Sequence, residues 1–203
     1  MITTVFFDCW GVLTHKRMRL FDSIIAELGL DESSHAYFVS LLDRMQVGRL
    51  SEEEFWQQFR AYCNIDPARQ VSSWQEHYAR VSAVDHDALA LAKELRGRGL
   101  RTGILSNIDP LAVRYIQAAK VTEPFDLTIY SCDVGIEKPE AGIYRAALTA
   151  AAAQPEQTIF IDDKAENIVA AEALGMHGVV FENALQTRRA LEKLLLASAA
   201  RSR

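Results

Sequence analysis

The sequence has few cysteines and no long apolar run. Its three cysteines, Cys9, Cys63 and Cys132, are far apart and lack CxxC spacing, which argues against a disulfide framework and against a zinc site. No apolar stretch reaches the roughly 20 residues that a membrane-spanning helix needs, and the N-terminus lacks the basic region and cleavage site of a signal peptide. We therefore expect a cytoplasmic protein with no membrane partner.

A strong excess of charge of one sign is also absent. The 22 basic and 27 acidic residues give a formal net charge of -5, and only Arg188, Arg189 and Lys193 form a modest basic group. This pattern lacks the basic stripe of a nucleic-acid-binding surface. With 203 residues, 49% of them hydrophobic, the chain can bury a full core in one large domain or in a domain that carries an insertion.

Near the N-terminus, an apolar run ends on a carboxylate and then turns through a glycine. Val5, Phe6 and Phe7 in succession indicate a central parallel strand that is covered on both faces. Asp8 follows where such a strand would end, and ligands of open α/β sheets bind at the carboxyl ends of strands. Taken alone, Asp8 could equally cap a turn.

From His15 to about Ala83 the pattern is helical, without strand signals. Helices are predicted from Leu20 to Leu28, from Ser34 to Met45, from a capping box at Ser51–Glu54, and around Trp74 to Val81. The aromatic residues of this segment, including Tyr62, are expected to pack in its core. Amphipathic helices of this kind can pack on the same chain or on another subunit, so a monomer and a homodimer are both open.

From Asp85 onward, short apolar strands alternate with helices, which predicts a parallel sheet with crossover helices. We expect a loop over residues 132–137, a helix that starts at Lys138-Pro139, and a frayed tail beyond Leu195. The remaining strands are predicted at residues 100–105, 126–131, 158–161 and 178–181.

Polar side chains end three of these strands. They are Asp8, the pair Ser106-Asn107 and the pair Asp162-Asp163, and Lys138 opens a helix after another strand. Because right-handed crossovers make parallel strands point the same way, these ends can converge on one edge of the sheet. Clustered carboxylates favour a hard cation such as Mg²⁺, while hydroxyl, amide and ammonium donors suit a phosphate.

Four ordered motifs resemble those of the haloacid dehalogenase-like (HAD) hydrolase superfamily. They are residues 7–13 (FDCWGVL), 105–107 (LSN), Lys138-Pro139, and residues 160–163 (FIDD) with Asn167. The resemblance implies an α/β fold: a Rossmann-like core, residues 1–14 and 84–203, with a parallel five-stranded sheet flanked by helices. Residues 15–83 would form an inserted α-helical cap. Residues 47–55 (VGRLSEEEF) also resemble the small-cap branch of this superfamily. That branch includes sugar-phosphate phosphatases and the N-terminal phosphatase domain of epoxide hydrolases.

The resemblance also implies roles for the motif residues. Asp8 would attack phosphorus and form an aspartyl-phosphate. Ser106 and Asn107 would hold the phosphoryl group. Lys138 would neutralise charge on Asp8 and on the phosphate. Mg²⁺ would be bound by Asp8, the backbone carbonyl of Trp10 and Asp163, with Asp162 binding directly or through water. Asn167 would orient the acidic pair. The implied activity is Mg²⁺-dependent phosphatase action on a small phosphorylated molecule.

Trp10 departs from the family pattern. At this position most phosphatases of this superfamily have a second Asp, which serves as general acid and base. General acid–base catalysis typically raises the rate by about 10² to 10⁴. The proton could instead come from water, the substrate or a cap residue, with His15 the nearest candidate.

Two other functions stay open. An aromatic residue at this position is characteristic of 2-haloacid dehalogenases, which work without a metal; the cap then offers only unplaced arginines, Arg17, Arg19 and Arg49, as a halide cradle. A catalytically impaired binding or regulatory member is the other alternative, but it would be expected to lose Asp8, Lys138 or Asp163 as well.

Overall fold

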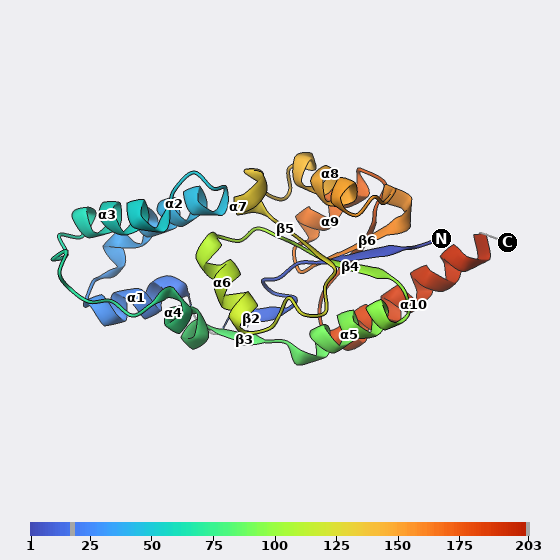
Figure 1. The fold of residues 1–203 in the computed structure, drawn as a ribbon, viewed down its shortest axis with the longest axis horizontal. Coiled ribbons are helices and arrows are strands. Elements are labelled where there is room, and N and C mark those ends of the chain that lie inside the picture. The colour runs from blue at the N-terminus through green and yellow to red at the C-terminus, as the bar shows by residue number, and fades with distance from the viewer. Residues whose placement is uncertain (17–18, 202–203) are drawn as a thin grey trace.

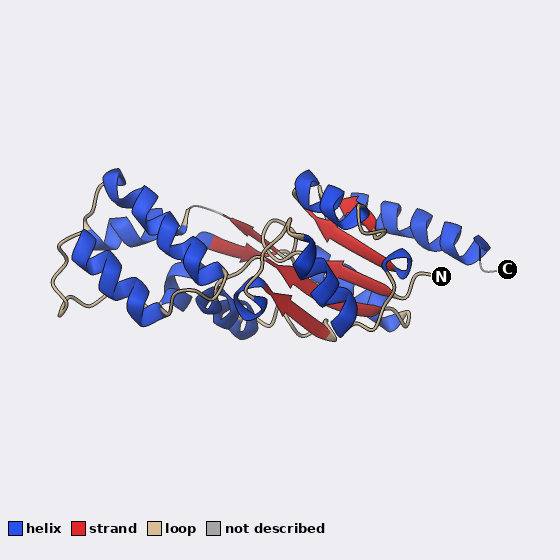
Figure 2. Cartoon of the chain, turned by 90° about the horizontal axis from the view of Figure 1, so that it is seen from above, coloured by secondary structure: helices blue, strands red, loops and turns tan. Residues whose placement is uncertain are grey.

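A five-stranded parallel sheet forms the centre of the computed structural model, which describes residues 1–16 and 19–201. The strand order is β5-β4-β1-β6-β7, and every neighbouring pair is parallel, as the sequence predicts. Figure 2 shows this sheet with helices on both sides. The strands are β1 (Thr4–Phe7), β4 (Arg101–Ser106), β5 (Leu127–Tyr130), β6 (Thr158–Asp162) and β7 (His177–Val180).

The apolar run of β1 is buried on both faces of the sheet. Val5 and Phe7 point into one core cluster and Phe6 into the other, and none of the three is exposed. Side chains of α8 and α9 pack on the face of Phe6, and those of α5 and α10 pack on the opposite face. The core is therefore three-layered, with helices α5 (His86–Gly97), α6 (Pro110–Ala118), α7 (Ser131–Val134), α8 (Ala141–Ala150), α9 (Ala165–Glu172) and α10 (Ala184–Arg201).

Four helices within residues 20–81 lie together at one end of the molecule (Figure 1). The predicted capping box is present at the start of one of them, where Ser51 Oγ accepts from the Glu54 amide and the Glu54 carboxylate accepts from the Ser51 amide. Tyr62 is an exception to the predicted burial, because its side chain is exposed and stacks on Tyr37. These helices are α1 (Leu20–Leu28), α2 (His35–Gln46), α3 (Glu52–Tyr62) and α4 (Trp74–Val81).

A two-stranded antiparallel ribbon connects this helical group to the sheet. It pairs β2 (Thr14–Lys16) with β3 (Ser82–Val84), so the expectation of no strand between His15 and Ala83 is wrong. Strands of three residues are too short for alternation to show in a sequence. The assignment of residues 15–83 to a cap and of residues 1–14 and 84–203 to a core stays a prediction.

Three further local predictions are corrected. Residues 131–134 form the short helix α7 inside the predicted loop, and the helix expected at Lys138-Pro139 begins later, at Ala141. The tail beyond Leu195 is helical to Arg201, because its alanines favour helix and the Ser198 hydroxyl accepts a 2.7 Å hydrogen bond from the Ile2 amide. Among the described helices, none is long and apolar enough to cross a membrane.

Candidate functional site

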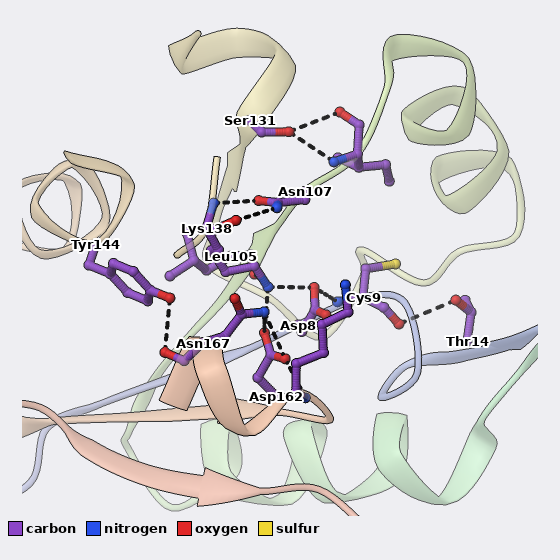
Figure 3. A network of polar contacts seen from close by, with 12 residues as sticks. Asp8, Cys9, Thr14, Leu105, Asn107, Ser131, Lys138, Tyr144, Asp162 and Asn167 are labelled. Atoms are coloured by element: carbon purple, nitrogen blue, oxygen red, sulfur yellow. Dashed lines mark hydrogen bonds and ion pairs between the residues drawn. The ribbon is translucent and has the colours of Figure 1, made fainter. Parts of the chain in front are cut away.

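The sheet brings the predicted strand ends together. Strands β4, β1 and β6 are neighbours, and Phe7 pairs with Ile104 on one side and Ile161 on the other. Asp8 and Asp162 therefore leave adjacent strands at the same level, and Ser106 ends the strand on the other side. Figure 3 shows Asp8, Asn107, Lys138, Asp162 and Asn167 in one polar network.

Lys138 is the centre of that network. Its buried Nζ donates to Asp162 Oδ2 at 2.6 Å and to the Leu105 carbonyl at 3.0 Å, and it lies 2.9 Å from Asp8 Oδ1. An ammonium group has three N–H donors, so these three acceptors use all of them. The position of Lys138 is therefore fixed, and its charge is shared by two carboxylates.

Asp162 is held by the protein on both of its oxygens. Asn167 Nδ2 lies 3.0 Å from each oxygen, and the Lys164 amide donates to Oδ1 at 2.8 Å. The side chain is completely buried. The backbone of Asn167 is in turn held by the Tyr144 hydroxyl, which donates to the Asn167 carbonyl at 2.9 Å. Asp162 and Asn167 thus form a rigid support next to the more open carboxylates.

Asp8, Asp162 and Asp163 can each place one carboxylate oxygen within 4.8 Å of the others. Burial raises the pKa of Asp8, which Asp162 raises further while Lys138 opposes the shift; desolvation and Asp162 raise the pKa of Asp163. Burial is the main cause of both shifts and the charge of Asp162 adds to it, so a further cation would stabilise the ionised forms of Asp8 and Asp163. Three oxygen donors with unbalanced negative charge fit a hard divalent cation such as Mg²⁺.

Asp8 is buried but keeps one oxygen open. The Cys9 amide donates to Asp8 Oδ1 at 2.7 Å, and Lys138 contacts the same oxygen. Oδ2 has no such contact within residues 1–16 and 19–201. The arrangement fixes the carboxylate by one oxygen and leaves the other for a ligand or a reaction.

The two residues after β4 differ in what they can offer a ligand. The buried Ser106 hydroxyl has no hydrogen-bond partner in the described part of the chain, although it is close enough to Asp8 to lower the pKa of that carboxyl. Asn107 is already engaged, because its Nδ2 donates to the Lys138 carbonyl at 2.9 Å and its Oδ1 accepts from the Lys138 amide at 2.8 Å. Asn107 therefore positions Lys138.

Trp10 presents an aromatic wall where an acid is usual in the family pattern. Its ring stacks on Tyr78 with 5.7 Å between ring centroids, and the Tyr78 hydroxyl donates to Asp109 Oδ2 at 2.6 Å. The sequence predicted Asp109 only as a helix cap, which it is, and Tyr78 only as a packing residue. Their pairing across the chain gives no signal in the sequence.

A polar cavity of about 520 Å³ opens above these groups. His15 is part of its lining, and His15 Nε2 lies 2.7 Å from Asp85 Oδ2. Gln46 and Glu137 also face the cavity, and no sequence motif identified them. The described lining comprises Asp8, Trp10, Gly11, His15, Gln46, Asn107, Glu137, Lys138, Asp163, Lys164 and Asn167.

Arg19 and Arg49, two of the arginines considered as a halide cradle, are not part of this lining. Arg19 forms ion pairs with Asp22 and Glu32 within the helical group, and Arg49 is exposed. Arg17 lies outside the described residues. The described part of the site therefore offers Lys138 and Lys164 as its cations, both next to carboxylates.

Comparison with known proteins identifies relatives of this chain. A family model described as haloacid dehalogenase-like hydrolase matches residues 2–175. Rat bifunctional epoxide hydrolase 2 is 32% identical over 117 residues, which are 55% of this chain and 21% of the relative. The chain therefore spans about a fifth of that relative's length. Sesquiterpene phosphatase astK from Aspergillus oryzae is 24% identical over 154 residues, 75% of this chain and 78% of the relative.

Solved structures give the same fold. A HAD family enzyme from Bacteroides thetaiotaomicron, in complex with magnesium and inorganic phosphate, superimposes with a TM-score of 0.77 and 22% identity. The superposition covers 90% of this chain and 97% of that one. At this identity the likeness confirms the Rossmann-like architecture, with its parallel sheet and flanking helices.

Proposed function

Because the chain belongs to the haloacid dehalogenase-like hydrolases, we propose that it is a Mg²⁺-dependent phosphatase that acts on a small phosphomonoester. The observation that carries the proposal is the juxtaposition of Asp8, Asp163 and Lys138 at one edge of the sheet, beside the unpartnered Ser106 hydroxyl. Carboxylates for a cation and donors for an anion in one cavity match the needs of phosphoryl transfer. The partner is a phosphorylated small molecule.

The residues present fit a Mg²⁺ ion by charge and donor type. Asp8, Asp163 and the backbone carbonyl of Trp10 would hold it, and Asp162, whose oxygens are already hydrogen-bonded, would bind directly or through water. When bound, Mg²⁺ supplies positive charge that lowers the repulsion between an anionic nucleophile and an anionic substrate.

In the first chemical step, the free oxygen of Asp8 attacks phosphorus. The bond between phosphorus and the ester oxygen breaks, and its electron pair leaves with the alcohol, which takes up a proton. Ser106 donates to a phosphoryl oxygen, with Asn107 beside it. Lys138 stays at its three acceptors and neutralises charge on Asp8 and on the transferred group. Water then attacks phosphorus and loses a proton to the group that protonated the alcohol, and the bond from phosphorus to the Asp8 oxygen breaks, which releases phosphate and restores Asp8.

Gly11 leaves room for the Asp163 carboxylate, because it has no side chain. It has a φ of +86°, and a Cβ at this position would lie 2.2 Å from Asp163 Oδ2. Gly11→Ala is expected to push that carboxylate aside and to weaken Mg²⁺ binding by about 10- to 100-fold. Calorimetric titration with Mg²⁺ measures the effect.

Gly29→Ala is the matched control for Gly11→Ala. Gly29 also has a positive φ, +67°, but no atom lies within 4 Å of the position of its Cβ. Both variants share a backbone strain of about 1–2 kcal/mol. Only Gly11→Ala should weaken Mg²⁺ binding; equal affinities in the two variants would contradict the assignment of Asp163 as a ligand.

His15 replaces the missing proton donor at position 10. It lines the polar cavity, and its ring is oriented by Asp85, whose Oδ2 lies 2.7 Å from His15 Nε2. His15→Asn is expected to slow hydrolysis of alkyl phosphates, whose leaving alcohols need a proton, by about 10²-fold. Acyl phosphates need less help and should be slowed far less. His86→Asn, at an exposed histidine, is the control and should keep the full rate. If His15→Asn slows both substrate types equally, the role of His15 is structural.

A panel of phosphate esters and 2-chloropropionate, each assayed with Mg²⁺ and with EDTA, tests the proposed function. We expect the esters to release phosphate. EDTA should abolish this release, and excess Mg²⁺ should restore it. Chloride release that EDTA does not affect, without phosphate release, would instead identify a 2-haloacid dehalogenase. Inactivity on both would favour a binding or regulatory member.

A further inference from the structure

A second cavity, of about 460 Å³, lies between the helical group and the core. Its walls come from helices α1, α2 and α4, from the loop after β1, from β3 and from the N-cap of α6. They are mainly apolar and aromatic, and include Trp10, Leu20, Phe38, Leu42, Tyr78 and Val81. The volume is in the range of ligand-binding cavities, which are usually lined in this way.

The apolar cavity meets the polar cavity at Trp10. Trp10 and Gln46 belong to the lining of both. The indole is held in place by its stacking on Tyr78, whose hydroxyl is fixed by Asp109. A molecule with its phosphate near Asp8 would therefore extend past a fixed aromatic wall into the apolar cavity.

Within residues 1–16 and 19–201, the charged groups that line the apolar cavity are already paired. Arg19 forms ion pairs with Asp22 and Glu32, and Asp109 accepts the hydrogen bond of Tyr78. The buried Ser82 hydroxyl has no hydrogen-bond partner among the described residues, and Gln46 and His35 are the other uncharged polar side chains of the lining. Since most of the lining is apolar or aromatic, the cavity suits an apolar group better than a sugar with a hydroxyl on almost every carbon.

We infer that the apolar cavity receives the organic group of the substrate, so that the substrate class is phosphomonoesters of apolar alcohols. This inference rests on the proposed phosphatase function for the position of the phosphate. It also gives Trp10 a role. Its indole cannot transfer a proton, but it forms the wall along which the apolar group of the substrate lies.

A series of n-alkyl phosphates from ethyl to decyl tests this inference, since their leaving alcohols differ little in acidity. We expect kcat/KM to rise by about fourfold for each buried methylene, equivalent to about 0.8 kcal/mol, until the cavity is full. Glycerol phosphate and glucose 6-phosphate should be poor substrates. Binding of the matching n-alkylphosphonates, measured by calorimetry, should follow the same trend and does not depend on turnover.

Val39→Glu places a charge in the lining of the apolar cavity at a position that is 37% exposed, so packing should survive. It should reduce the decyl-to-ethyl preference at least tenfold. Leu196→Glu, on α10 at the far end of the molecule (Figure 1), is the control and should leave the preference unchanged.

The outcomes separate this inference from the phosphatase function. Hydrolysis and phosphonate binding that do not depend on chain length would overturn the apolar subsite while leaving the phosphatase function intact. Length-dependent phosphonate binding without phosphate release from any ester would support the subsite and contradict the phosphatase function. Length dependence that Val39→Glu leaves unaltered would place the apolar chain elsewhere and overturn the inference.

Discussion

Asp8→Asn is expected to reduce turnover by about 10⁴-fold or more, because the change removes the nucleophile while nearly preserving its shape. An amide oxygen at this position cannot form the aspartyl-phosphate. The amide should nevertheless fit, since the contacts of Asp8 Oδ1 with the Cys9 amide and with Lys138 need only an oxygen acceptor. Initial rates of phosphate release, with circular dichroism to check the fold, measure the effect.

Asp87→Asn is the control for Asp8→Asn, because Asp87 is an exposed residue of α5 outside the cavity lining. It should retain the full rate. If Asp8→Asn keeps a substantial rate while folded, Asp8 is not the nucleophile and the mechanism assigned to the strand ends is wrong.

Lys138→Met is expected to lower both stability and activity. The ammonium lies within 2.6 Å of Asp162 and 2.9 Å of Asp8, and all three side chains are buried. Removing one member of a buried ion pair leaves uncompensated charge and typically costs about 3–5 kcal/mol. Denaturant unfolding in EDTA measures the loss, because bound Mg²⁺ would replace part of the missing positive charge.

Lys93→Met, on the exposed side of α5, is the matched control and should change stability little. Adding Asp162→Asn to Lys138→Met should recover part of the lost stability, since it removes one of the stranded charges. A Lys138→Met protein as stable as the wild type would contradict the charge balance described for this site.

The convergence of the strand ends was predictable from the sequence. Right-handed connections make the strands that end on Asp8, Ser106 and Asp162 point the same way, so their ends can converge on one edge of the sheet. The same pattern predicted the sheet, although it missed the ribbon of β2 and β3, whose strands of three residues show no alternation.

What a side chain does with its hydrogen bonds was not predictable. An amide such as that of Asn107 can bind a phosphate or a backbone equally well, and the fold decides by bringing Lys138 next to it. The apolar cavity is likewise a product of tertiary packing. It exists because α4 places Tyr78 against Trp10, and neither residue alone indicates a binding site.

In the proposed mechanism, Asp8 carries the phosphoryl group during turnover. Asp8 is the only acidic residue in the tryptic peptide of residues 1–16, so the claim can be tested on that peptide. The enzyme is quenched during turnover of a phosphate ester and reduced with borohydride, which converts an aspartyl-phosphate to homoserine, and the peptide is sequenced by mass spectrometry. We predict homoserine at position 8, and none in Asp8→Asn. Phosphate release with an unmodified Asp8, or with the modified carboxylate elsewhere in the chain, would contradict the account.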